Sequence, residues 1–213
     1  MLKKYKITIR ICAFLLITSL LLSGVCIDTQ AKSSSKKNGQ SDQSTECPYK
    51  NKEKISLDKN WKYADHAKIT SGYAVFYKAK KNRKNIVVGI NAGHGTKGGT
   101  SMKTLCHPDG SAKVTGGTTK AGATKAVAVS SGMSFRDGTK ESTVTLKMAK
   151  ILKKKLLAEG YDVLMLRDGK DVQLDNVART VICNNVADMH IALHWDGDGL
   201  KYDKGCFYIG VPD

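Results

Sequence analysis

Hydrophobic and polar residues change their spacing along the chain, and from residue 86 onward strand-like and helix-like patterns alternate. Short apolar runs predict four strands, at 85–92, 161–166, 188–195 and 205–211. Two longer stretches, in which every third or fourth residue is apolar, predict helices at 141–159 and 173–186. We therefore predict a single α/β domain with a mainly parallel sheet and helices on both of its faces.

The first predicted helix has lysines on one side and apolar residues on the other. Glu141 precedes Val144 and Met148 by three and seven residues, which predicts that its side chain also faces the core. Thr139 is the predicted N-cap and Gly160 the residue that ends the helix. The residues predicted to face the core in the two helices are Val144, Met148, Ile151, Leu152, Leu156, Leu174, Val177, Val181 and Ile182.

Residues 1–31 have the pattern of a signal peptide, in which basic residues precede the apolar stretch 11–22. This stretch is shorter than the roughly 20 apolar residues that a membrane-spanning helix needs. Cleavage is expected after Ala31, which predicts a secreted protein. Lipidation of Cys26 and an uncleaved membrane anchor remain as alternatives.

Three further segments follow the signal peptide. Residues 32–54 are polar and rich in Ser and Lys, which predicts a flexible basic linker. Residues 55–85 contain scattered aromatic residues and one candidate strand at 73–79, and their structure is otherwise open. The folded domain is predicted at 86–213. Within it, residues 96–138 are rich in Gly, Ser, Thr and Lys, and we expect this long insertion to line or cover a binding groove.

The formal net charge is +16, and such a basic protein attracts polyanions. For an exported protein these are anionic wall polymers or lipid headgroups, so no nucleic acid partner is predicted. Lysines that only keep the protein soluble are the alternative. Four cysteines follow the signal peptide without a C-x-x-C pair, so they are interpreted as structural and their pairing stays open: Cys47, Cys106, Cys183 and Cys206.

The turn after the first predicted strand contains Gly93, Gly95 and Gly98, which match the G-x-G-x-x-G spacing of a nucleotide-binding loop. Such a loop opens an amphipathic helix, and a second strand that ends in an acidic residue follows about twenty residues later. The sequence after residue 95 has neither feature. We therefore predict no nucleotide cofactor, and we interpret the turn as a presenter of His94.

Three side chains are candidates for chemistry. His94 and His194 follow two different predicted strands, and the carboxyl ends of parallel strands are where active sites gather. Glu141 is a carboxylate on the core-facing side of a helix, which is unusual without a partner. Two histidines and one glutamate with an open fourth position would form a catalytic zinc site. Taken singly, Glu141 is also good helix-capping chemistry, and each histidine could be structural.

His190 and His194 have the H-x-x-x-H spacing, but the zinc peptidase motif needs a helix and a Glu after the first histidine. Here the local pattern is a strand, in which residues four apart lie about 13 Å from each other. One metal ion cannot bind both.

Several motifs resemble the zinc-dependent N-acetylmuramoyl-L-alanine amidases of bacterial cell walls, in their type-3 amidase domain. The resemblance covers residues 86–211 and is carried by "INAGHG", "KESTVTLKMAKILKKKLLAEGYDVLMLRDGKDVQL", "ARTVICNNVADMHIALHWD" and "KGCFYIGVP". It implies one Zn²⁺ bound by His94, Glu141 and His194, with Arg179 and Asn184 as structural or substrate support. It also implies peptidoglycan as the substrate and a location at the cell wall.

The chain departs from the family pattern in two places. The insertion between His94 and Glu141 is longer than the resemblance leads one to expect. The general acid/base of the family is a glutamate beyond the strand at 205–211, so we expect it beyond Asp213 and interpret the domain as truncated at its C-terminus. A wall-binding domain that retains zinc but is catalytically impaired, and an unrelated exported zinc peptidase, are the alternatives.

Overall fold

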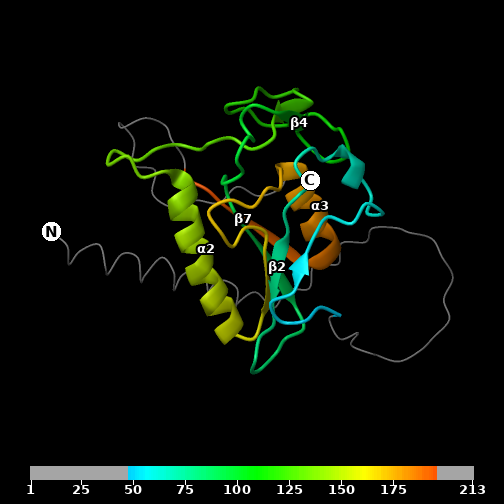
Figure 1. The fold of residues 1–213 in the computed structure, drawn as a ribbon, viewed down its shortest axis with the longest axis vertical. Helices are drawn as coiled ribbons and strands as arrows, with labels where there is room; N and C mark the ends of the chain where they lie inside the picture. Colours follow the sequence, from blue (N-terminus) through cyan, green and yellow to red (C-terminus); the bar gives the residue numbers. More distant parts are fainter. Residues whose placement is uncertain (1–47, 196–213) are drawn as a thin grey trace. The chain divides into compact units, whose positions relative to one another are not determined.

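Five strands form one mixed sheet in the computed structural model, which describes residues 48–195 (Figure 1). The strand order is β1-β2-β6-β3-β7. β3 pairs with β6 and with β7 in parallel, whereas the β1–β2 and β2–β6 pairs are antiparallel. The bounds are Lys54–Ile55 for β1, Ala74–Tyr77 for β2, Val87–Ala92 for β3, Asp162–Met165 for β6 and Met189–Leu193 for β7.

The prediction of a mainly parallel sheet is therefore not confirmed. The difference arises from the N-terminal segment, whose strand β2 joins the sheet beside β6. Only residues 78–86 connect β2 to β3. A parallel crossover needs a dozen or more residues, so this short connection reverses the chain direction.

Two α-helices accompany the sheet: α2 (Glu141–Ala158) and α3 (Asn176–Val186). A short 3-10 helix, η1, spans Ala64–His66. α3 begins three residues later than predicted, because Asp175 is the N-cap and its side chain accepts a hydrogen bond from the Ala178 N–H at 2.8 Å. The four residues predicted to face the core in this region are all buried: Leu174, Val177, Val181 and Ile182.

The inner face of α2 differs from the prediction. Met148 and Ile151 are 44% and 53% exposed, whereas Thr145 and Ala149 are fully buried. Thr145 can face the interior because its hydroxyl donates a hydrogen bond to the carbonyl of Gly93 at 3.0 Å. The predicted N-cap is also wrong: Lys140 occupies that position and makes no side-chain cap.

Alternate residues of β3 contribute to two different core clusters. Val87 belongs to a cluster with Phe76, Leu164 and residues of α3, while Val88 and Ile90 pack with residues of α2. This division follows from the two-residue period of a strand. α2 and α3 thus pack against different sets of sheet residues (Figure 1).

The insertion predicted at 96–138 contains a second, two-stranded antiparallel sheet, formed by β4 (Lys103–Leu105) and β5 (Lys125–Val127). After β5 the chain passes the first residue of α3, where the Ala128 carbonyl accepts from the Asn176 N–H at 3.2 Å and Ala128 and Val129 are buried. The Val129 N–H donates to the carbonyl of Gly99 at 3.2 Å. This return brings the residues after 129 close to the turn that follows β3.

The described end of the predicted linker packs on the sheet. The ring centroid of Tyr49 lies 5.4 Å from that of Phe76, and the Lys52 N–H donates to the Phe76 carbonyl at 2.7 Å. The predicted signal peptide, linker residues 32–47 and the strand at 205–211 lie outside the described residues. No helix within residues 48–195 has the length and apolar character that crossing a membrane requires. Cys106 and Cys183 are free thiols, and Cys47 and Cys206 lie outside the described part.

Candidate metal centre

His94, Glu141 and His194 converge at the carboxyl end of β3 and β7. His94 follows β3, His194 follows β7, and Glu141 is the first residue of α2. His94 Nε2 lies 2.9 Å from Glu141 Oε1 and 3.1 Å from His194 Nδ1, and His194 Nδ1 lies 3.2 Å from Glu141 Oε1. These three atoms form a compact triangle that could hold a metal ion. The His94 and Glu141 side chains are buried, but that of His194 is 52% exposed, so the triangle is open on one side.

The turn after β3 places the His94 imidazole in this cluster. His94 itself has a left-handed backbone with φ of 65°, and Gly95 follows with φ of 74°. A non-glycine residue in this region is uncommon, and at functional sites its strain is held by the surrounding structure. Gly93 serves a different purpose, because a Cβ there would lie 2.4 Å from the His194 ring. The tight turn after β3 therefore depends on the backbone conformation of His94 itself as well as on Gly93 and Gly95.

The Ser130 carbonyl fixes the orientation of the His94 ring. His94 Nδ1 lies 2.9 Å from this oxygen, so Nδ1 carries the hydrogen and donates it. In the neutral ring, Nε2 is then a free lone pair that points at Glu141 and His194. A histidine that ligates a metal typically has such a partner on its other nitrogen.

Glu141 is held by backbone donors as well as by the histidines. The Trp195 N–H donates to Oε1 at 2.8 Å, and the Met133 N–H donates to Oε2 at 2.9 Å. Burial alone would raise the pKa of this carboxyl. The close contacts with the His194 and His94 rings, together with the hydrogen bonds from the two backbone amides, outweigh burial and hold the pKa of this carboxyl well below its ordinary value. Glu141 is therefore ionised at neutral pH, which is the form that binds metal.

Comparison with known families decides the identity of this domain. Residues 88–208 match the family model for N-acetylmuramoyl-L-alanine amidase. The chain belongs to this family. Membership indicates an amidase that hydrolyses peptidoglycan in the cell wall, in a family that is typically metal-dependent. No curated protein and no solved structure matches the chain.

In this amidase, Arg179 supports the turn that carries His94. Its buried guanidinium donates to the carbonyl of His94 at 2.7 Å and to the hydroxyl of Thr96 at 2.9 Å. Arg179 also donates to Asn91 Oδ1 at 3.1 Å. Asn184, the other predicted support residue, is exposed on α3, whereas Asn91 makes this contact from β3.

Arg167 supports the same turn. It is not predicted from the sequence as a support residue, unlike Arg179 and Asn184. It is fully buried and donates to the carbonyls of Ala92 and Gly93 at 3.0 and 2.9 Å and to Thr145 Oγ1 at 3.0 Å. Burial lowers the pKa of both guanidinium groups, to about 10 for Arg167 and about 9 for Arg179, so both are cationic at neutral pH. The position of Arg167 directly after an apolar strand is the one sign of this role in the sequence.

His190 and Gly98 do not belong to the converging cluster. His190 is in β7, four residues before His194, and is not among the side chains that converge. Gly98 has a φ of 80° and no atom within 4 Å of the place where a Cβ would stand, so it contributes a turn rather than a ligand cradle. Ser130 and Met133 lie in the irregular insertion, 36 residues after His94 and eight residues before Glu141, and no motif points to them. Trp195 directly follows His194, but its contact is made by the backbone amide, which no residue type marks.

Proposed function

We propose that this amidase cleaves the amide between the lactyl group of N-acetylmuramic acid and the L-alanine of the peptide, with one Zn²⁺ bound by His94, Glu141 and His194. The spacing of the three ligand atoms supports this proposal. Their separations of 2.9, 3.1 and 3.2 Å are close to the edge of about 3.3 Å in a tetrahedral zinc site with bonds near 2.0 Å.

The protonation pattern of His94 is a second support. Because Nδ1 donates to Ser130, the neutral ring directs its Nε2 lone pair at the ionised Glu141 oxygen. Two acceptors 2.9 Å apart repel each other unless a proton or a cation lies between them. A proton can be shared by two of the three atoms, whereas a metal cation satisfies all three.

The donor set favours zinc over the harder cations. Two imidazole nitrogens and one carboxylate oxygen suit Zn²⁺, whereas Mg²⁺ and Ca²⁺ prefer oxygen ligands. When bound, zinc supplies an acidified water for attack and polarises the amide carbonyl. The surrounding residues have a fixed role: the Ser130 carbonyl holds the tautomer of His94, and the Met133 and Trp195 amides keep Glu141 ionised.

The remaining parts of the proposal concern location. We propose that residues 1–31 direct export, that 32–47 tether the domain and that 86–213 form the amidase domain at the cell wall, with residues 48–85 packed on the same sheet. The net charge of +16 supports an additional attraction to anionic wall polymers. The general acid/base that the resemblance implies, a glutamate expected beyond Asp213, is not among the residues that the structure describes.

Metal analysis tests the ligand assignment. Purified wild type is expected to contain about one zinc per chain, and His194→Ala is expected to lose most of it, because two ligands hold the ion much less tightly. His190→Ala is the matched control, since it removes an imidazole from the same strand without touching the triangle. Equal zinc content in wild type and His194→Ala contradicts the ligand assignment.

Activity on defined substrates tests the reaction. Release of L-alanyl peptide from a synthetic N-acetylmuramoyl peptide should stop on chelation and return with added zinc. Cleavage of peptide–peptide bonds with intact muramyl amides would instead support the exported zinc peptidase. Zinc and wall binding without release of peptide would support the impaired wall-binding domain.

A further inference from the structure

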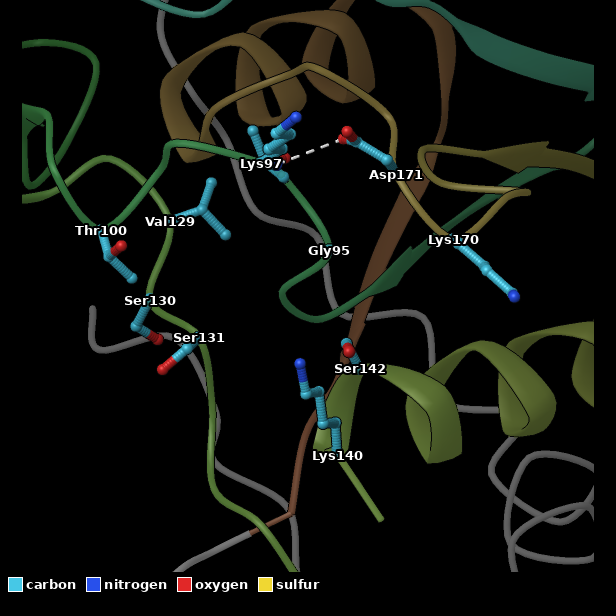
Figure 2. Close-up of a pocket in the computed structure, with 11 residues that line it drawn as sticks. Gly95, Lys97, Thr100, Val129, Ser130, Ser131, Lys140, Ser142, Lys170 and Asp171 are labelled. Atoms are coloured by element: carbon cyan, nitrogen blue, oxygen red, sulfur yellow. Dashed lines mark hydrogen bonds between the residues drawn. The ribbon is translucent and has the colours of Figure 1, made fainter. Parts of the chain in front are cut away.

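A cavity of about 270 Å³ lies beside the candidate metal centre (Figure 2). We propose that it binds a carboxylate of the substrate's peptide and so gives the amidase a preference for acidic over amidated peptides. This inference rests on the proposed function. The residues that line the cavity and carry the argument are Gly95, Lys97, Ser130, Lys140, Ser142 and Lys170.

The cavity adjoins the metal centre through its lining residues. Gly95 follows His94 directly, and Lys140 and Ser142 stand on either side of Glu141. Ser130 lines the cavity and also accepts the hydrogen bond from His94 Nδ1. Figure 2 shows the Lys140 side chain extending toward the turn at Gly95. A substrate whose amide lies at the triangle can therefore place a neighbouring group in the cavity.

The lining is cationic, with three lysines and one acid. Within residues 48–195, the ammonium groups of Lys97, Lys140 and Lys170 have no acidic partner. The acid, Asp171, is already engaged, since its Oδ1 accepts from the backbone amides of Lys97 and Gln173 at 3.3 and 3.1 Å. The ammonium groups are thus not neutralised by ion pairs in this part of the chain, and that of Lys140 lies nearest the turn at Gly95, whereas Lys170 extends away from it (Figure 2).

Two buried charges add to this field. Among residues 48–195, Arg167 and Arg179 donate hydrogen bonds only to neutral acceptors, which are backbone carbonyls, hydroxyls and one amide oxygen, while Asp171 and Asp175 act on them through space. Arg167 reaches the carbonyl of Ser142, a lining residue, and Arg179 reaches Thr96, another lining residue. Buried charges are weakly screened, so both guanidinium groups attract an anion at the cavity.

The chemistry of the substrate selects the peptide as the occupant. The muramic acid on one side of the scissile amide is uncharged once its lactyl group is amidated, whereas the peptide on the other side carries free carboxylates. The cavity is slightly smaller than the roughly 300–1,000 Å³ of pockets that enclose a whole small molecule. It therefore suits one acidic residue of the peptide.

The test compares two probes that differ in one group: N-acetylmuramoyl-L-alanyl-D-glutamate and its α-amide, N-acetylmuramoyl-L-alanyl-D-isoglutamine. Binding to the zinc-loaded full chain is measured by calorimetry, and cleavage is followed separately. The wild type should bind the acid about tenfold more tightly than the amide, and added salt should reduce this ratio. Lys140→Ala and Lys97→Ala should each lower the ratio, whereas Lys150→Ala, which removes a lysine from the exposed side of α2, should leave it unchanged.

Each result bears on one proposal. Equal affinity of the wild type for the two probes overturns the inference, and so does an acid preference that Lys140→Ala and Lys97→Ala both retain. Tight binding of poly(glycerol phosphate) at this cavity, with displacement by neither probe, also overturns it in favour of a wall polymer as occupant. An acid preference without cleavage of either probe leaves the inference standing and contradicts the proposed reaction.

Discussion

At the scale of single residues, Gly132 controls the space around the candidate metal ligands. Its φ is +80°, and a Cβ built there lies 2.7 Å from Glu141 Oε2 and 2.9 Å from His94 Nε2. We expect Gly132→Ala to weaken zinc affinity about tenfold or more, because disturbing the contacts that orient metal ligands typically costs 10–100-fold. Competition with a chromogenic zinc chelator measures this change.

Gly138 supplies the matched control for this substitution. Its φ is +78°, so alanine meets nearly the same backbone strain, but no atom lies within 4 Å of the place where its Cβ would stand. Gly138→Ala should therefore lose stability to a similar degree and keep its zinc affinity. Equal zinc affinity in the two variants would show that crowding at Gly132 does not reach the ligands.

Arg179 gives a second prediction at this scale. We expect Arg179→Lys to lower the free energy of unfolding by about 3 kcal/mol, because an ammonium cannot serve the several separate acceptors that the guanidinium reaches. Urea denaturation of the metal-free protein measures the change. Arg136→Lys, at an exposed position, should stay within about 0.5 kcal/mol of wild type. A loss no larger than that of the control would contradict the supporting role of Arg179.

Sequence reasoning can find the three converging residues but not most of their supports. His94 and His194 are predictable because parallel strands bring their carboxyl ends together, and this holds for β3 and β7. Ser130 contacts His94 through its backbone carbonyl across 36 residues of irregular chain. Every residue has such a carbonyl, so no residue type marks the position. Asn184 is predicted by resemblance, and the asparagine beside Arg179 is Asn91.

At the scale of elements, the prediction of α2 is nearly right in its bounds and wrong in its inner face. Apolar spacing predicts Met148 inside, but the buried positions follow Glu141, Thr145 and Ala149 at intervals of four. A threonine whose hydroxyl is hydrogen-bonded and a small alanine can both be buried against a sheet. A pattern of large apolar residues does not identify either position. The burial of Glu141 is therefore predicted correctly, although the prediction assumes that Met148 faces the core, and Met148 is exposed.

The contact between β3 and α3 depends on Gly89. A Cβ at this position would lie 2.3 Å from Cys183 Sγ, so glycine lets the helix approach the strand. We expect Gly89→Ala to destabilise the protein by about 1–3 kcal/mol through overpacking. The Cys183 thiol adds no charge to this contact at neutral pH, since burial raises its pKa to about 12.

A double-mutant cycle with Cys183→Ala isolates this contact. Removing the sulfur should reduce the cost of Gly89→Ala by about 1 kcal/mol, although the carbonyl of Met189 at 3.2 Å keeps part of it. Unfolding midpoints of the four proteins provide the measurement. Strict additivity of the two substitutions would mean that the sulfur is not what limits the approach of α3.

At the scale of the whole molecule, the excess of 35 basic over 19 acidic residues is the property that the fold does not explain. Four lysines lie on the exposed side of α2: Lys147, Lys150, Lys154 and Lys155. Charges spread in this way act together at a distance set by salt, about 10 Å at 0.1 M. They can attract an anionic polymer without a shaped site, which distinguishes this effect from the cavity beside the metal centre.

We expect the full chain to bind isolated cell walls that carry anionic polymers and to release them as sodium chloride rises from about 0.05 M to about 0.5 M. Walls stripped of these polymers should bind less protein at low salt and should show little dependence on salt. Sedimentation of the walls and assay of the supernatant measure both. Because stripping leaves the peptidoglycan in place, the difference between the two wall preparations reports the charge attraction alone. Equal, salt-independent binding to both would mean that the lysines serve only solubility.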